Sequence, residues 1–128
     1  MTLTWKFLLQ FDFSKPLPNQ RSSETIQKYN NFKKLNKDIC SYIKNKYLNN
    51  CDYCIIKNDF PYDTEKDVKH YILWIKDSFL ENINKRDIED LIQKKMLELE
   101  YSNYIYFENH ISVQTVPDIK HFQIFYKK

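Results

Sequence analysis

The sequence predicts a single α+β domain whose mostly antiparallel sheet is covered on one face. Two observations carry this prediction. Segments dense in β-branched and aromatic residues occur in two pairs, and a segment with helical periodicity precedes each pair. The chain also has 128 residues, of which 42% are apolar and 16% aromatic, enough for one hydrophobic core. We therefore expect one domain over residues 1–128, with an extended N-terminal segment (1–20) before the core (21–128).

The first half of the chain begins with LTWKFLLQFDF (3–13), expected to be extended or briefly helical with its aromatic rings on the core. Prolines make residues 14–19 a linker. A helix is then predicted over residues 23–48, with Ser23 as its N-cap. Apolar residues at helical spacing give this helix one buried stripe, formed by Ile26, Tyr29, Phe32, Leu35, Ile39, either Tyr42 or Ile43, and Tyr47. A strand over 51–57 follows.

The segment from Asn58 to Lys76, NDFPYDTEKDVKHYILWIK, is the centre of the predicted fold. Asn58 and Pro61 favour a turn, because an Asn side chain bonds nearby backbone and proline fixes φ. A strand over 68–75 comes next. Since side chains alternate between the faces of a strand, His70 and Trp74 share one face, with Lys76 at its end.

The second half of the chain repeats the pattern of helix, strand and strand. We expect a loop over 77–85 and then a helix, which Asn84 caps together with Asp87 three residues later. Strands are predicted over 101–108 and 119–126, with a loop between them. In the last strand, His121, Gln123 and Phe125 share a face.

Composition excludes several classes of function. The chain has no glycine, which excludes Gly-rich phosphate-binding loops. Its net charge of +3 is too small to indicate a nucleic-acid-binding surface by itself, and no apolar run is long enough to span a membrane. Three cysteines, an odd number, favour a reducing compartment, so we expect a protein of the cytoplasm or nucleus. The bias toward Asn, Lys, Ile and Tyr is typical of an AT-rich genome, and the composition leaves open whether the source is fungal or viral.

The two histidine strands are the main candidate for a site. If the strands are neighbours, His70 and His121 share a cleft with Gln123 and can act on a phosphate or acyl group, because histidine titrates near neutral pH. The alternative is that each is a hydrogen-bonded core or surface histidine. Spacing alone does not decide between them.

Two further motifs each have an ordinary explanation. Cys51 and Cys54 form a C-x-x-C, but a zinc site needs two more ligands and no second such pair exists, so we expect free thiols, no metal and no cofactor. The lysines of the first helical segment can meet an RNA backbone, or can equally form a solvated helix face; they are Lys33, Lys34, Lys37, Lys44 and Lys46.

These residues together resemble a fungal family of unknown function, the N-acetylglucosamine-induced protein 1 family. The family pattern has an Arg-Ser before a spaced tyrosine, as in Arg21-Ser22 and Tyr29. Its most specific block is an N-D-F/W-P-Y turn leading to a histidine, a tryptophan and a lysine, as in 58–62, His70, Trp74 and Lys76. The rest of the pattern falls on Phe107, Asn109, Thr115-Val116-Pro117 and His121-Phe-Gln123.

The second half is also weakly similar to a degenerate histidine-triad domain. Such domains have an Asn-ending strand, a Gln-Ser/Thr segment and a closing strand with alternating histidines, as in Asn109, Gln114-Thr115 and His121-Phe-Gln123; Ile119 stands where the first histidine of that strand is expected. This resemblance implies that His121 is a nucleophile toward phosphorus.

Two functional hypotheses follow. In the first, the domain is a nucleotide- or sugar-phosphate-binding hydrolase or transferase, or a relic of one. Its catalytic residues would be His121, Gln123 and His70, and its substrate-binding residues Asn109, Thr115, Trp74 and Lys76. In the second, it is a non-catalytic scaffold for a protein or nucleic-acid partner. We expect no membrane partner, and the sequence gives no oligomeric state.

Overall fold

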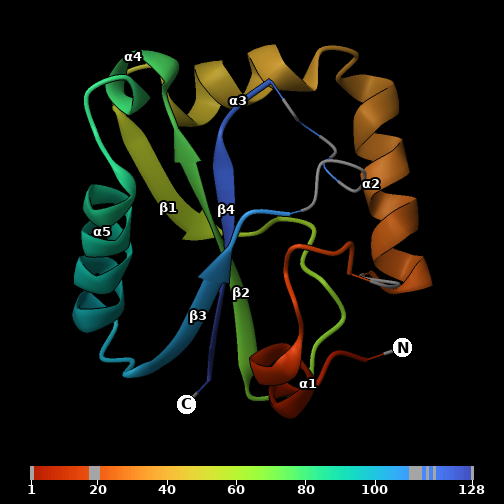
Figure 1. The fold of residues 1–128 in the computed structure, drawn as a ribbon. Helices are drawn as coiled ribbons and strands as arrows, with labels where there is room; N and C mark the ends of the chain where they lie inside the picture. The colour runs from red at the N-terminus through yellow and green to blue at the C-terminus, as the bar shows by residue number, and fades with distance from the viewer. Residues whose placement is uncertain (1, 18–20, 110–113, 115, 117, 128) are drawn as a thin grey trace.

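The computed structural model describes residues 2–17, 21–109, 114, 116 and 118–127, and it confirms the α+β class. Four strands form one sheet in the order β1-β2-β4-β3, and every neighbouring pair is antiparallel. The elements are α1 (Trp5–Gln10), α2 (Ser23–Leu35), α3 (Ile39–Tyr47), β1 (Tyr53–Lys57), β2 (Val68–Ile75), α4 (Asp77–Leu80), α5 (Lys85–Glu98), β3 (Asn103–Phe107) and β4 (His121–Lys127) (Figure 1).

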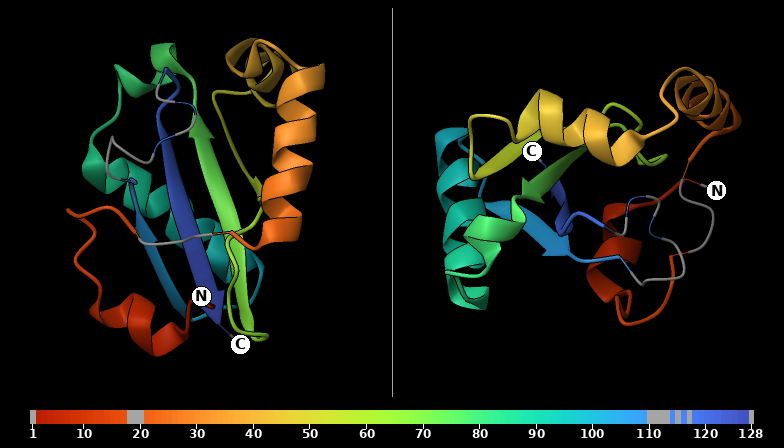
Figure 2. Two further views of the ribbon diagram at one scale, coloured as in Figure 1. Left: turned by 90° about the vertical axis from the view of Figure 1, so that its right-hand side faces the viewer. Right: turned by 90° about the horizontal axis from the view of Figure 1, so that it is seen from above.

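Both faces of the sheet are covered, so the expectation of a single covered face is wrong. Seen from above, α5 lies on one side of the strands, and α2, α3 and the N-terminal segment lie on the other (Figure 2). Ile43 and Leu48 pack on Ile72 and Trp74 of β2. Helices α2 and α3, which precede β1, and helix α5, which follows β2, thus cover opposite faces of the sheet.

The single long helix predicted over 23–48 is also wrong, because the chain breaks it at residues 36–38. The Asp38 side chain accepts a hydrogen bond from the Ser41 N–H and starts a separate helix, α3. Ser22, not Ser23, caps α2. Without one continuous axis the predicted stripe is not buried as a unit, and Leu35 is 85% exposed.

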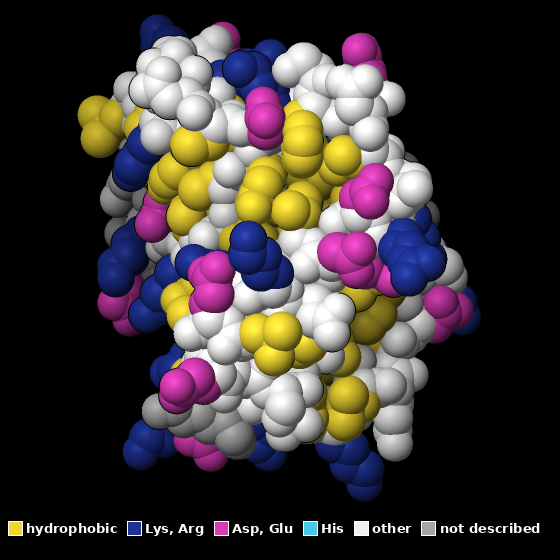
Figure 3. All heavy atoms as spheres, turned by 90° about the vertical axis from the view of Figure 1, so that its left-hand side faces the viewer, with side chains coloured by type: hydrophobic (Ala, Val, Ile, Leu, Met, Phe, Trp, Pro, Cys, Tyr) yellow, Lys and Arg dark blue, Asp and Glu magenta, His cyan; other side chains and the backbone are white. Residues whose placement is uncertain are grey.

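The face under α5 is built from apolar contacts. Asn84 and Asp87 form the predicted capping box, which starts α5. From there Ile88, Ile92 and Met96 pack against the sheet residues Leu73, Ile75 and Ile124. Figure 3 views the molecule from the side of α5 and shows apolar side chains at the outer surface, between charged ones. Residues 77–80 form the short helix α4 where we expected only a loop.

The pairing of β2 with β4 brings the two histidine strands together, as predicted. Trp74 is paired with His121, Ile72 with Gln123, and His70 with Phe125. The predicted bounds of β2 are confirmed, and those of β1, β3 and β4 differ by one or two residues. We call the face that carries His70, Trp74, His121 and Gln123 the histidine face.

The segment between β1 and β2 folds over the histidine face. The Asn58 side chain accepts from the Phe60 N–H at 2.8 Å, which confirms the predicted turn. Tyr62 is buried against Phe125. The N-terminal segment closes the other end of this face, where Phe13 stacks on Phe107 with ring centroids 3.8 Å apart.

Candidate ligand-binding cavity

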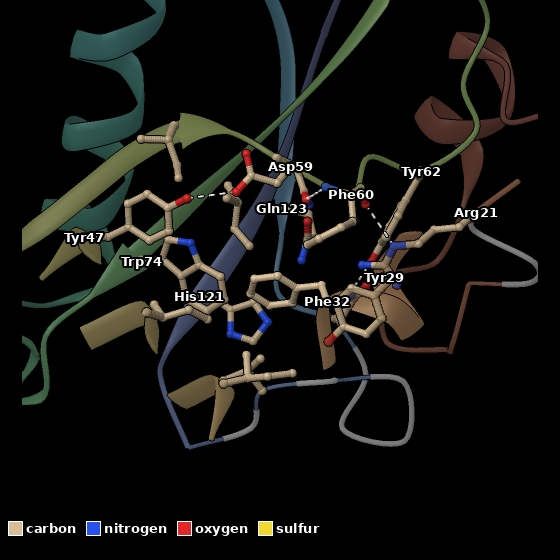
Figure 4. Close-up of a pocket in the computed structure, with 17 residues that line it drawn as sticks. Arg21, Tyr29, Phe32, Tyr47, Asp59, Phe60, Tyr62, Trp74, His121 and Gln123 are labelled. Atoms are coloured by element: carbon tan, nitrogen blue, oxygen red, sulfur yellow. Dashed lines mark hydrogen bonds between the residues drawn. The ribbon is translucent and has the colours of Figure 1, made fainter. Parts of the chain in front are cut away.

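A cavity of about 70 Å³ lies between the histidine face, helices α2 and α3, and the turn at residues 58–62. It is lined mainly by aromatic and polar side chains (Figure 4). The predicted site residues Trp74, Asn109, His121 and Gln123 all line it. Four of the seven predicted residues therefore meet at one cavity.

His70 lies beside this cavity but does not line it, because it is buried behind Gln123. The Tyr62 backbone N–H donates to its Nδ1 at 3.0 Å. Since Nδ1 accepts, the proton of the neutral ring is on Nε2, which donates to Gln123 Oε1 at 2.5 Å. Burial lowers the pKa of His70 to about 3, although its bond to Gln123 opposes that shift. His70 is thus a neutral, fully hydrogen-bonded core residue at pH 7.

The bond to His70 fixes the orientation of the Gln123 amide. Because Gln123 Oε1 accepts from His70, its Nε2 is the end left for other partners. No described residue accepts a hydrogen bond from this amide nitrogen. Gln123 therefore contributes an N–H donor to the cavity.

His121 has the opposite tautomer. Its Nδ1 lies 2.7 Å from the Ile119 carbonyl oxygen, which can only accept, so Nδ1 carries the proton. Burial lowers the pKa of His121, and the ring is neutral at pH 7. No residue in the described part of the chain bonds its Nε2. Nε2 is therefore a basic nitrogen available to the cavity, and the centroids of the His121 and Trp74 rings are 4.8 Å apart.

Aromatic rings from α2, α3 and the turn form the walls. The Phe60 ring lies 5.0 Å from that of Tyr29 and 5.2 Å from that of Phe32. Tyr29 is 9% exposed, and its hydroxyl has no hydrogen-bond partner among the described residues. An unpaired buried hydroxyl costs free energy, so a further hydrogen-bonding group at this position would stabilise the protein.

A positively charged and a negatively charged side chain, Arg21 and Asp59, line different parts of the cavity wall. Arg21 Nε donates to the Phe60 carbonyl oxygen at 2.9 Å, and the guanidinium lies over the Tyr29 and Tyr62 rings. Asp59 accepts from the Tyr47 hydroxyl at 2.9 Å, toward the Trp74 side of the cavity (Figure 4). Burial, followed by this bond, raises the pKa of Tyr47 to about 12, so the hydroxyl stays protonated.

The sequence assigns no site role to Arg21, Tyr47 or Asp59. The family pattern includes Arg21 and Asp59 and is the only signal in the sequence that points to them. These three residues reach one cavity because the chain breaks between α2 and α3 and turns at 58–62. Strand alternation predicts neither feature.

The other predicted residues have different positions. Asn109 is buried, and its amide Nδ2 donates to the Tyr62 hydroxyl at 2.5 Å. Lys76 is exposed beyond the end of β2, where it lines a separate groove with Lys44 and Asp77. Thr115 lies outside the described residues. The structure therefore does not bring Lys76 to the histidines.

Neither the cysteines nor the lysines of the first helical segment line this cavity. Cys40, Cys51 and Cys54 are free, and the described residues contain no cluster of three or more metal-ligating side chains. On the basic helices, Lys33 lies over the Tyr29 ring and Lys46 bonds the Tyr42 hydroxyl. Within the described residues, no helix has the length and apolar character that crossing a membrane requires.

The comparisons with known proteins establish the family. The model of a family described as "Protein of unknown function (DUF3605)" matches residues 11–127. This chain belongs to that family. No curated protein sequence matches the chain.

Among solved structures, the crystal structure of HTC1 has a similar fold. The TM-score is 0.69 at 20% sequence identity, over 98% of this chain and 85% of HTC1. At that identity the likeness concerns the fold alone. Neither comparison supports the histidine-triad resemblance, and the N-acetylglucosamine-induced protein 1 family remains a prediction.

Proposed function

We propose that this domain binds a small organic ligand, or one group of a larger ligand, in the cavity on the histidine face. One observation carries the proposal. Polar atoms without partners among the described residues, namely the Tyr29 hydroxyl, His121 Nε2 and the Gln123 amide nitrogen, belong to residues that line one aromatic-walled cavity. Ligand pockets typically combine apolar walls with a few polar groups that fix orientation.

The size of the cavity limits what it encloses. Pockets that enclose a drug-sized ligand have volumes of roughly 300–1,000 Å³, against about 70 Å³ here. A nucleotide or sugar phosphate would therefore insert its ring or another small group, and its phosphate would stay outside. Arg21, the one cation that lines the cavity in the described part of the chain, already bonds the Phe60 carbonyl.

A catalytic role is the second candidate, and the tautomer of His121 favours it. Its Nδ1–H is held by the Ile119 carbonyl, so a neutral Nε2 is available as a general base or nucleophile. His70 lacks this property, because both of its ring nitrogens are already bonded. In a catalytic domain, His121→Ala would abolish turnover and leave ligand binding measurable.

A cavity-filling variant tests the binding proposal. Ile56 lines the cavity, whereas its neighbour Ile55 packs on the α5 side of the same strand. Wild type, Ile56→Phe and the matched control Ile55→Phe are screened by thermal shift with nucleobases, nucleosides, nucleotides and sugar phosphates. A ligand at 100 times its Kd adds about 2.7 kcal/mol to the free energy of unfolding.

We expect at least one ligand to stabilise wild type and Ile55→Phe but not Ile56→Phe. The proposal is wrong if no compound stabilises wild type, or if every active compound stabilises Ile56→Phe equally.

A further inference from the structure

The floor of the cavity carries a hydrogen-bond donor and a hydrogen-bond acceptor, from side chains two residues apart on the same strand. Gln123 and His121 lie two residues apart on β4, so both side chains project from the same face of the sheet. Gln123 contributes its amide N–H and His121 its unprotonated Nε2. Both residues line the cavity.

The backbone sets the polarity of both groups. On one side, the Tyr62 N–H can only donate, which makes His70 Nδ1 an acceptor, His70 Nε2–H a donor and Gln123 Oε1 an acceptor. On the other, the Ile119 carbonyl can only accept, so His121 is protonated on Nδ1. Neither side chain can reverse its role without breaking a buried hydrogen bond, which would cost free energy.

We propose that the cavity recognises the lactam edge of a single-ring heterocycle, in which a carbonyl stands next to a ring N–H. The carbonyl accepts from the Gln123 amide, and the ring N–H donates to His121 Nε2. This inference rests on the proposed function and names the chemical class of its ligand. Pyridones and pyrimidine bases with an N–H beside a carbonyl belong to this class.

The walls and the volume fit a planar ring of this size. Trp74, Phe32 and Phe60 offer aromatic faces, on which flat heterocycles stack. A buried water needs roughly 10–15 Å³ of such space, so a cavity of about 70 Å³ accommodates about five or six heavy atoms. That is about the size of one six-membered ring without its substituents and less than a fused pair, which favours monocyclic over bicyclic lactams.

Isomeric probes separate edge recognition from simple stacking. 2-Pyridone has adjacent carbonyl and N–H groups, 4-pyridone has the same groups at opposite ends of the ring, and N-methyl-2-pyridone lacks the N–H. Each is titrated into the wild-type protein and followed by amide chemical shifts. We expect 2-pyridone to bind at least ten times more tightly than either of the others.

His121→Phe is the matched variant, because it keeps an aromatic ring beside Trp74 and removes only the ring nitrogens. We expect the His121→Phe variant to bind 2-pyridone and N-methyl-2-pyridone equally well. Equal binding of 2-pyridone and 4-pyridone by wild type, or no binding of 2-pyridone, would overturn the lactam inference. The Ile56→Phe screen judges the proposed function separately, since a ligand of any other class would still satisfy it.

Discussion

The two faces of the sheet use the same strands for different purposes. Under α5, Leu73, Ile75 and Ile124 meet apolar helix residues, and this face has no buried polar side chain among the described residues. The buried polar side chains all lie on the opposite side, in or beside the histidine face; they are His70, Asn109, His121 and Gln123. Because the side chains of a strand alternate, one strand supplies both an apolar core face and a polar face.

The difference extends to the two histidines within the polar face. His70 has a partner on each ring nitrogen and lies behind Gln123. His121 has a described partner on Nδ1 alone and borders the cavity. Of the two buried histidines, only His121 therefore has a ring nitrogen that is left without a partner among the described residues.

The largest effect is expected on the apolar face. Ile92 is fully buried under the sheet, so Ile92→Ala should lower the free energy of unfolding by about 2–5 kcal/mol, because it leaves a cavity. Urea denaturation measures this loss, and Leu97→Ala, at a residue 69% exposed, is the control. Binding at the histidine face should not change in Ile92→Ala while the protein is folded. Weaker binding would mean that the faces are not independent.

Gln123→Leu tests the paired part of the histidine face. It leaves the buried His70 Nε2–H without an acceptor, which should cost about 1–3 kcal/mol. Combining it with His70→Phe removes both partners, so the double variant should lose less stability than the two single variants added together. Strictly additive losses in urea denaturation would show that the two side chains do not interact.

The stability of the protein should fall as pH decreases below about 6.5. His70 has a pKa of about 3 when folded and near 6.5 when unfolded, so the unfolded chain takes up the proton first. The stabilising effect is complete above pH 6.5 and is lost as pH falls toward 3, at up to about 1.4 kcal/mol per pH unit. His121, whose pKa is also lowered, acts in the same direction.

Urea denaturation between pH 7 and 5.5 measures this dependence. The variant His70→Phe/Gln123→Leu serves as the control, and its dependence should be shallower than that of wild type. An equal slope in the two proteins would contradict a neutral, buried His70.

The turn over the histidine face should give the smallest effect. Pro61→Gly increases the freedom of the unfolded chain and should cost about 1 kcal/mol. The turn itself is held by the Asn58 side chain, so amide shifts of the cavity residues should stay close to those of wild type. A neutral or stabilising result would mean that the proline does not restrict the turn.

The sequence could predict the strands and their faces because alternation is local. The assignment of His70, His121 and Gln123 to one face needed only strand periodicity and the pairing of β2 with β4. It could not predict the cavity, because Arg21, Tyr47 and Asp59 come from three separate segments. The break at Asp38 does not show in the apolar spacing, which continues on both sides of it, although aspartate is itself a common N-cap residue.

The tautomers of the two histidines provide the most direct test of this account. Long-range proton–nitrogen correlation spectra of ¹⁵N-histidine-labelled protein at pH 7 distinguish protonation on Nδ1 from protonation on Nε2. We predict that both rings are neutral, with His70 protonated on Nε2 and His121 on Nδ1. A charged ring at either position, or the same tautomer at both, would contradict the donor and acceptor roles assigned to Gln123 and His121.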